Sequence, residues 1–210
     1  LAGSSAEKTR LLLDALDELG LLSKYVAMDV NETELADFGR IVCDAYPQIW
    51  AHGILGDVHK RLDRVPYGGR RLFAFLGSTV GNFYPDERAR FFADLAAQAV
   101  PGDSFLLGTD LVKPVERLLA AYDDAQGVTE AFIKNALTVL NRTVGANFDV
   151  GAFEYAVTWN HHDARLELEL ESTRAQRVRL GDLDLDLDFA RGEPLRVEIS
   201  AKFSRAQVES

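Results

Sequence analysis

The chain of 210 residues contains one cysteine, Cys43, so it cannot form a disulfide bond within itself. Basic residues are also few, because 23 Lys and Arg oppose 33 Asp and Glu and give a formal net charge of −10. This charge argues against nucleic acid or an anionic membrane as the main partner, and a small-molecule substrate fits better.

Long hydrophobic runs are missing as well. None approaches the roughly 20 residues that span a bilayer, and no signal peptide is recognised, so we expect a cytoplasmic protein and a monomer. Cys43 falls in a helical pattern with apolar neighbours, and we expect it to be a small core residue. The hydrophobic content of 47% and the charged content of 27% are those of an ordinary globular protein.

The pattern of apolar residues alternates between helix and strand as far as about residue 112. We expect helices at 7–19, 32–45 and 86–98, and strands at 25–29, 54–57, 71–77 and 104–110. This alternation favours an α/β domain with a parallel sheet that helices cover on both faces. Two helices, 115–122 and 128–141, and then strands at 153–160, 165–172, 183–189 and 194–203 predict an attached α+β lobe over residues 113–210.

A loop of small residues follows the strand that ends at Leu76. The run Gly77-Ser78-Thr79-Val80-Gly81-Asn82 places flexible backbone and one amide side chain at the carboxyl edge of the sheet. Open α/β sheets bind their ligands at this edge, so we expect a pocket that includes Asn82.

Two acidic residues close successive strands of the first domain. A small, polar segment with Gly3 leads into the first helix, Asp29 ends the strand at 25–29, and Asp57 ends the next strand. This order resembles an S-adenosylmethionine-dependent methyltransferase of the Rossmann type, which implies Gly3 beside the methionine part, Asp29 on the ribose and Asp57 on the adenine. Since residue 1 already falls where the first core strand should be, we expect the sequence to be truncated at its N-terminus.

The second lobe carries polar residues that could hold a substrate. Tyr122 stands at a polar turn between two helices, where its hydroxyl could bond a ligand or the ring could pack the turn. Near the end of the chain, the period of two places Glu198, Ser200 and Lys202 on one face of a strand. Glu198 and Ser200 would lie roughly 6 to 7 Å apart and could hold one small heterocycle; the alternative is a solvated strand face.

Four motifs in order carry a more specific resemblance: residues 3–10, 76–83, 121–129 and 197–203. Together they resemble the histidine-specific Nα-methyltransferases of the ergothioneine pathway, and the likeness runs through almost the whole chain. The resemblance implies transfer of three methyl groups from S-adenosylmethionine to the α-amine of L-histidine, giving hercynine, with no metal. It therefore implies a Rossmann-like cofactor domain over residues 1–112 and a substrate-binding lobe over residues 113–210.

The resemblance also implies a role for each motif residue. The cofactor-binding residues would be Gly3, Lys8, Asp29, Asp57 and Val58. Asn82 and Tyr122 would hold the carboxylate and amine of histidine at the reacting centre, and Glu198 and Ser200 would grip its imidazole.

The implied reaction is a direct displacement in which positioning supplies most of the acceleration. Two alternatives stay open. One is a methyltransferase of another amino acid, such as a tryptophan derivative, which would change Glu198 and Ser200. The other is a non-catalytic fragment that retains the fold.

Overall fold

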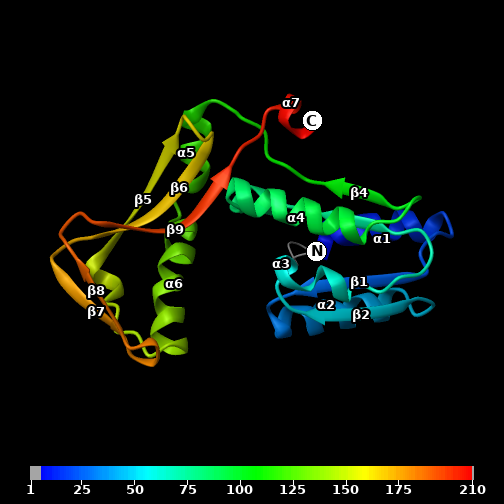
Figure 1. Ribbon diagram of the computed structural model, residues 1–210, viewed down its shortest axis with the longest axis horizontal. Helices are drawn as coiled ribbons and strands as arrows, with labels where there is room; N and C mark the ends of the chain where they lie inside the picture. Colours follow the sequence, from blue (N-terminus) through cyan, green and yellow to red (C-terminus); the bar gives the residue numbers. More distant parts are fainter. Residues whose placement is uncertain (1–5, 210) are drawn as a thin grey trace. The chain divides into compact units, whose positions relative to one another are not determined.

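The computed structural model describes residues 6–209, and the chain divides into two compact units, Leu1–Thr109 and Asp110–Ser210 (Figure 1). Both units combine helices with strands, which confirms the mixed α/β character expected from the sequence. The elements of the first unit are α1 (Ala6–Glu18), β1 (Lys24–Asp29), α2 (Glu32–Ala45), β2 (Trp50–Leu55), α3 (Val58–Arg61), the 3-10 turn η1 (Leu62–Arg64), β3 (Leu72–Phe75), the 3-10 turn η2 (Thr79–Asn82), α4 (Pro85–Gln98) and β4 (Ser104–Leu107).

The strands of the first unit pair in parallel. Strand β1 pairs with β2 in a register that sets Asp29 opposite Leu55, and β3 pairs with β4 so that Phe75 lies opposite Leu107. Parallel strands bring their carboxyl ends to the same edge, so the residues that follow β1 and β2 are neighbours.

Helix α2 covers the β1–β2 pair through one apolar stripe. Val42 and Tyr46 of this region are buried with Leu13 of α1. Cys43 is exposed, so its expected place in the core was wrong. The reason is the helical period, which turns Cys43 by about 100° from Val42 and out of the buried stripe.

The second unit contains α5 (Val115–Tyr122), α6 (Val128–Thr143), the 3-10 turn η3 (Val150–Ala152), β5 (Phe153–Asn160), β6 (Arg165–Ser172), β7 (Gln176–Leu180), the 3-10 turn η4 (Gly181–Leu183), β8 (Leu185–Phe189), β9 (Pro194–Ala201) and α7 (Arg205–Glu209). Strands β5, β6 and β9 form an antiparallel sheet in the order β5-β6-β9, and β7 pairs with β8 in a separate antiparallel hairpin. Helices α5 and α6 pack against the three-stranded sheet, as the green and yellow elements of Figure 1 show.

The register of the β5-β6-β9 sheet decides which face each residue of β9 occupies. Leu168 pairs with Glu198, and Leu166 pairs with Ser200. Leu166 and Leu168 belong to the buried core that also includes Ile133 of α6, and paired residues point to the same face. Glu198 and Ser200 therefore point to the face that the helices cover.

Within residues 6–209, none of the helices combines the length and the apolar character that crossing a bilayer requires.

Candidate active site

In the first unit, the two predicted acids follow neighbouring strands. The backbone N–H of Gly56 donates to the carbonyl oxygen of Asp29 at 2.9 Å, so the β1–β2 ladder continues to the residue before Asp57. Asp29 and Asp57 thus lie at the same edge of this parallel pair.

Both carboxylates also organise the backbone that follows them. Asp29 Oδ1 accepts from the backbone N–H of Asn31 at 2.8 Å, and Asp57 Oδ1 accepts from that of His59 at 2.9 Å, where Val58 opens α3. Asp57 also forms an ion pair with Lys60, at 3.7 Å between Oδ2 and Nζ. Lys8 is exposed in the first half of α1, and Gly3 lies outside the described residues.

The loop after β3 forms a tight turn. Gly77 and Ser78 adopt positive φ values of 75° and 60°, and η2 then carries the chain to Asn82. Left-handed backbone is uncommon for a residue with a Cβ such as Ser78. Gly81 is buried, and Phe83 is anchored by the ring of His59 at a centroid distance of 4.1 Å, so the backbone on both sides of Asn82 is held in place.

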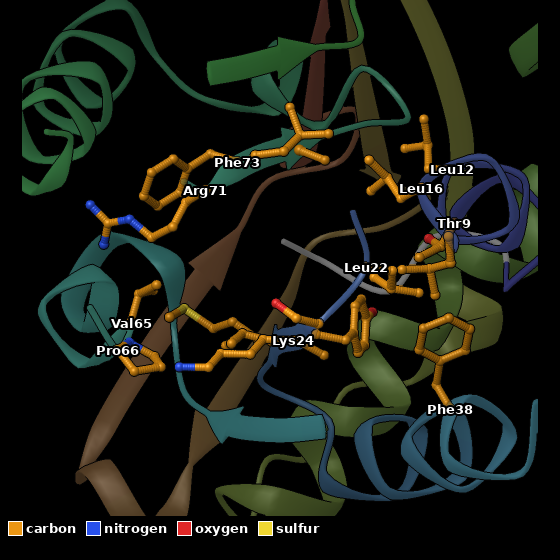
Figure 2. A pocket seen from close by; sticks show the side chains of 18 of the residues that line it. Thr9, Leu12, Leu16, Leu22, Lys24, Phe38, Val65, Pro66, Arg71 and Phe73 are labelled. Atoms are coloured by element: carbon orange, nitrogen blue, oxygen red, sulfur yellow. The ribbon is translucent and has the colours of Figure 1, made fainter. Parts of the chain in front are cut away.

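The first unit also contains a cavity of about 780 Å³, which β1 and β3 both line (Figure 2). Figure 2 shows Leu12 and Leu16 of α1, Phe38 of α2 and Phe73 of β3 among the side chains around it. The lining is mostly apolar. Of the predicted site residues that the structure describes, Asp29 alone lines it.

In the second unit, three side chains from α5 and the end of β9 form a hydrogen-bonded cluster. Tyr122 Oη and Ser200 Oγ lie 2.9 Å apart, and Lys202 Nζ donates to Tyr122 Oη at 2.9 Å and to Ser200 Oγ at 2.6 Å. Ser200 is 3% exposed and Lys202 is 2% exposed. The solvated-face alternative is therefore wrong for these two residues, because α5 covers this part of the sheet.

A carboxylate balances the buried charge of Lys202. Asp110 Oδ2 lies 3.5 Å from Lys202 Nζ, and Asp110 Oδ1 lies 2.5 Å from Lys113 Nζ. Burial alone would raise the pKa of Asp110, but the two ammonium groups outweigh it and hold the pKa below its ordinary value. The backbone N–H of Phe203 donates to the Asp110 carbonyl at 2.9 Å and ties the two segments together.

Tyr155 of β5 adds a further hydroxyl to this polar region. Its hydroxyl donates to the carbonyl oxygen of Tyr122 at 2.9 Å. Burial, followed by the negative charges of Asp123 and Glu198, raises the pKa of Tyr155 to about 12.

The structure thus joins two of the predicted residues directly, Tyr122 and Ser200, and places Glu198 on the same strand face. It adds Lys202, Asp110 and Tyr155, to which the sequence analysis gave no role. Only Lys202 had a visible signal, since it continues the alternation of Glu198 and Ser200. Asn82 belongs to the first unit and Tyr122 to the second, so their joint role stays a prediction.

Among the residues that the structure describes, no three His, Cys, Asp or Glu side chains gather as a metal site would require. The cluster is instead a set of hydrogen-bond donors and acceptors around one buried cation.

Comparison with known proteins identifies similar sequences over the whole chain. A family model described as "Histidine-specific methyltransferase, SAM-dependent" matches residues 1–210. The Histidine N-alpha-methyltransferase of Mycolicibacterium smegmatis is 47% identical over 203 residues, which cover 97% of this chain and 63% of that protein. The protein of the same name from Mycobacterium tuberculosis is 46% identical, with coverage of 97% and 63%. The chain therefore spans less than two thirds of the length of these two relatives.

More distant matches have other names. The 4-dimethylallyltryptophan N-methyltransferase easF of Aspergillus fumigatus is 28% identical over 222 residues, covering 99% of this chain and 65% of that protein. Among solved structures, the CcbJ methyltransferase from Streptomyces caelestis matches with a TM-score of 0.39 and 15% identity, covering 95% of this chain and 65% of that one.

Proposed function

Because the chain belongs to the family of histidine-specific, S-adenosylmethionine-dependent methyltransferases, we propose that it methylates the α-amine of L-histidine. The product of three successive transfers is the trimethylated betaine, hercynine. The proposal places the chain in ergothioneine biosynthesis, as the sequence resemblance implies.

The observation that carries the proposal is the polar cluster of the second unit. Ser200 lies two residues from Glu198 on the covered face of β9, and its hydroxyl is bonded to Tyr122. A carboxylate and a hydroxyl at this spacing can bond the two nitrogens of an imidazole ring. We therefore assign Glu198 and Ser200 to the imidazole, and Tyr122 with Asn82 to the carboxylate and amine of the substrate.

The first unit offers groups that suit the cofactor. Asp29 and Asp57 end at one edge of a parallel strand pair, and their oxygens are acceptors for ribose hydroxyls and an adenine amine. Val58 follows Asp57 at the start of α3, and Lys8 and Gly3 complete the proposed set. The two parallel strand pairs are separate two-stranded sheets in residues 6–209. We also propose that both pairs belong to one Rossmann-like domain, since β1 and β3 line the same cavity. When bound, S-adenosylmethionine supplies the methyl group from its sulfonium.

The protein's share of the chemistry is positioning. The α-amine attacks only in its neutral form, and ordinary α-amines have a pKa near 8, so a useful neutral fraction exists close to neutrality. Holding the amine in line for transfer removes most of the entropic barrier. Tyr122 suits this task because it ends α5 beside Ser200, the residue assigned to the imidazole.

A rival function within the same enzyme class is methylation of a tryptophan derivative, which the name of the Aspergillus fumigatus relative describes for that protein. An indole ring has one N–H and no ring acceptor, so it could bond only one of Glu198 and Ser200. A site arranged for two hydrogen bonds discriminates against a ligand that makes only one of them. The two residues therefore favour histidine.

The test is an incubation of the protein with S-adenosylmethionine and L-histidine, with L-tryptophan in a parallel reaction, analysed by mass spectrometry. We expect histidine with one, two and three added methyl groups, and unmodified tryptophan. A Glu198→Gln variant should accumulate much less product at limiting histidine and keep its affinity for S-adenosylhomocysteine by calorimetry. Methylated tryptophan would establish the rival, and failure to bind either histidine or S-adenosylhomocysteine would indicate a non-catalytic scaffold.

A further inference from the structure

Lys202 is the buried cation at the centre of the second unit's polar cluster. Its ammonium group donates to Ser200 Oγ at 2.6 Å and to Tyr122 Oη at 2.9 Å, and it lies 3.5 Å from the Asp110 carboxylate. The ammonium has three N–H donors and no acceptor. Two of them bond the hydroxyl oxygens, and Asp110 forms an ion pair with the same group. Lys202 also sits 4.8 Å from the centre of the Tyr122 ring.

The bonds of Lys202 determine where the hydroxyl protons can go. Ser200 and Tyr122 must both accept from the ammonium, so neither hydroxyl can direct its proton to Lys202. Their mutual contact of 2.9 Å uses one of the two hydroxyl protons, whichever residue donates. The hydroxyl that receives this proton has then accepted two bonds and must donate its own proton elsewhere. The pair therefore keeps one hydroxyl proton to donate, and this proton belongs to Ser200 when Tyr122 donates the mutual bond.

On the same strand face, Glu198 provides a hydrogen-bond acceptor. It lies two residues from Ser200, roughly 6 to 7 Å along the strand, and an ionised carboxylate only accepts. A fixed donor beside an acceptor matches the neutral imidazole, which has one N–H and one bare nitrogen. The imidazolium ion has two N–H groups, so one of them would face the hydroxyl donor and the positive charge of Lys202.

We propose that Lys202 is a positioning residue that orients the Ser200–Tyr122 hydroxyl pair as a donor, so that the site binds histidine as neutral imidazole in one tautomer. This inference rests on the proposed function. In this proposal Lys202 acts on substrate recognition through Ser200 and Tyr122, the two hydroxyls that it contacts.

The first test compares two amino acids that differ in the bare ring nitrogen. Histidine has this acceptor, and pyrrolylalanine has an N–H but no acceptor nitrogen. We expect Lys202→Met to raise the KM for histidine about tenfold, the effect of one charge-assisted hydrogen bond. Affinity for pyrrolylalanine, measured as inhibition of histidine methylation, should change less than about twofold, and the KM for S-adenosylmethionine should stay at the wild-type value.

The matched control is Lys134→Met, which removes a lysine of the same unit whose partner is Glu130 on α6. This variant should keep the wild-type preference for histidine over pyrrolylalanine. Lys202→Arg, which retains the charge and the donors, should recover part of the preference. An equal loss of both ligands in Lys202→Met, or no loss of either, would overturn the inference.

A second measurement needs no variant and so remains decisive if Lys202→Met fails to fold. Nitrogen NMR of isotopically labelled histidine, bound to the wild-type protein with S-adenosylhomocysteine, should show one protonated and one bare ring nitrogen. Two protonated nitrogens would overturn the inference while the proposed function stands. Wild-type protein that neither binds nor methylates histidine would overturn the proposed function and this inference with it.

Discussion

Replacing Ser200 with alanine removes one atom from the centre of the polar cluster and little else. Ser200 Oγ accepts from Lys202 Nζ at 2.6 Å and contacts Tyr122 Oη at 2.9 Å, and the residue is 3% exposed. The first of these hydrogen bonds is charge-assisted and the second is neutral. Their combined loss should lower the free energy of unfolding of the second unit by about 2 to 4 kcal/mol.

The assay is urea denaturation followed by tryptophan fluorescence. The chain has 2 tryptophans, and Trp159 lies in the same row of the sheet as Ser200, because both pair with Leu166. A Trp50→Phe background leaves Trp159 as the reporter of the second unit. In this background Ser200→Ala should shift the midpoint to lower urea with an unchanged slope.

The control is Ser204→Ala, which alters an exposed serine four residues further along the chain. It should shift the midpoint much less, since it loses only a local bond to the backbone of Gln207. A Ser200→Ala midpoint within error of the control would refute the reasoning that this cluster is an energetic centre of the unit. Calorimetry should also show that Ser200→Ala weakens histidine binding about tenfold.

Three further predictions concern stability. Asp124 accepts from the backbone N–H groups of Val128 and Thr129, both at 2.9 Å, so Asp124→Ala should destabilise α6 by about 1 kcal/mol. If the melting temperature of Asp124→Ala equals that of Asp124→Asn, this prediction is wrong. Hydrogen bonds from Arg71 lower the pKa of Asp103 to about 2, so its stabilising contribution is complete above about pH 4 and disappears as the pH falls through 2. Urea midpoints between pH 5 and 2 should fall less steeply in Asp103→Asn than in wild type, and equal slopes would count against the assignment. The pKa of Tyr155 is raised to about 12, so the contribution of Tyr155 to folding stability is present below about pH 10 and is lost as the pH rises through 12. Tyr155→Phe should flatten this alkaline loss of stability. The same alkaline profile in wild type and variant would exclude this contribution.

The alternation of apolar and polar residues was sufficient to predict most helices and strands, but some boundaries depend on contacts between elements. Strand β2 begins at Trp50, although the prediction began it at residue 54. The early part was missed because Gly53 reads as a breaker. In the fold, a Cβ at Gly53 would lie 3.2 Å from the side chain of Leu35 on α2, so a larger residue there would require Leu35 to shift by a few tenths of an ångström.

Strand β7 was missed for a related reason. Its arginines resemble a solvated loop in the sequence, but in the hairpin Arg177 and Arg179 pair with Asp186 of β8 at 2.9 and 3.4 Å. The predicted strand at 183–189 starts later, at Leu185, because η4 and the left-handed Asp184 turn the chain first. Each feature depends on a partner that lies apart from it in the sequence.

In the candidate site too, the local sequence pattern predicts some features, and others depend on contacts between elements. The period of two was enough to put Glu198, Ser200 and Lys202 on one face, because side chains alternate along any strand. Whether that face meets water or a helix depends on packing: Ser200 and Lys202 are buried, and Tyr122 of α5 contacts both. Asp110 could not be predicted, since its contact with Lys202 joins residues 92 positions apart, 110 and 202.

The most direct test of the account is a crystal structure of the protein with L-histidine and S-adenosylhomocysteine. The account predicts one imidazole nitrogen within about 3 Å of the Glu198 carboxylate and the other within the same distance of the Ser200 hydroxyl. An imidazole bound away from β9, with Glu198 and Ser200 contacting neither nitrogen, would contradict it.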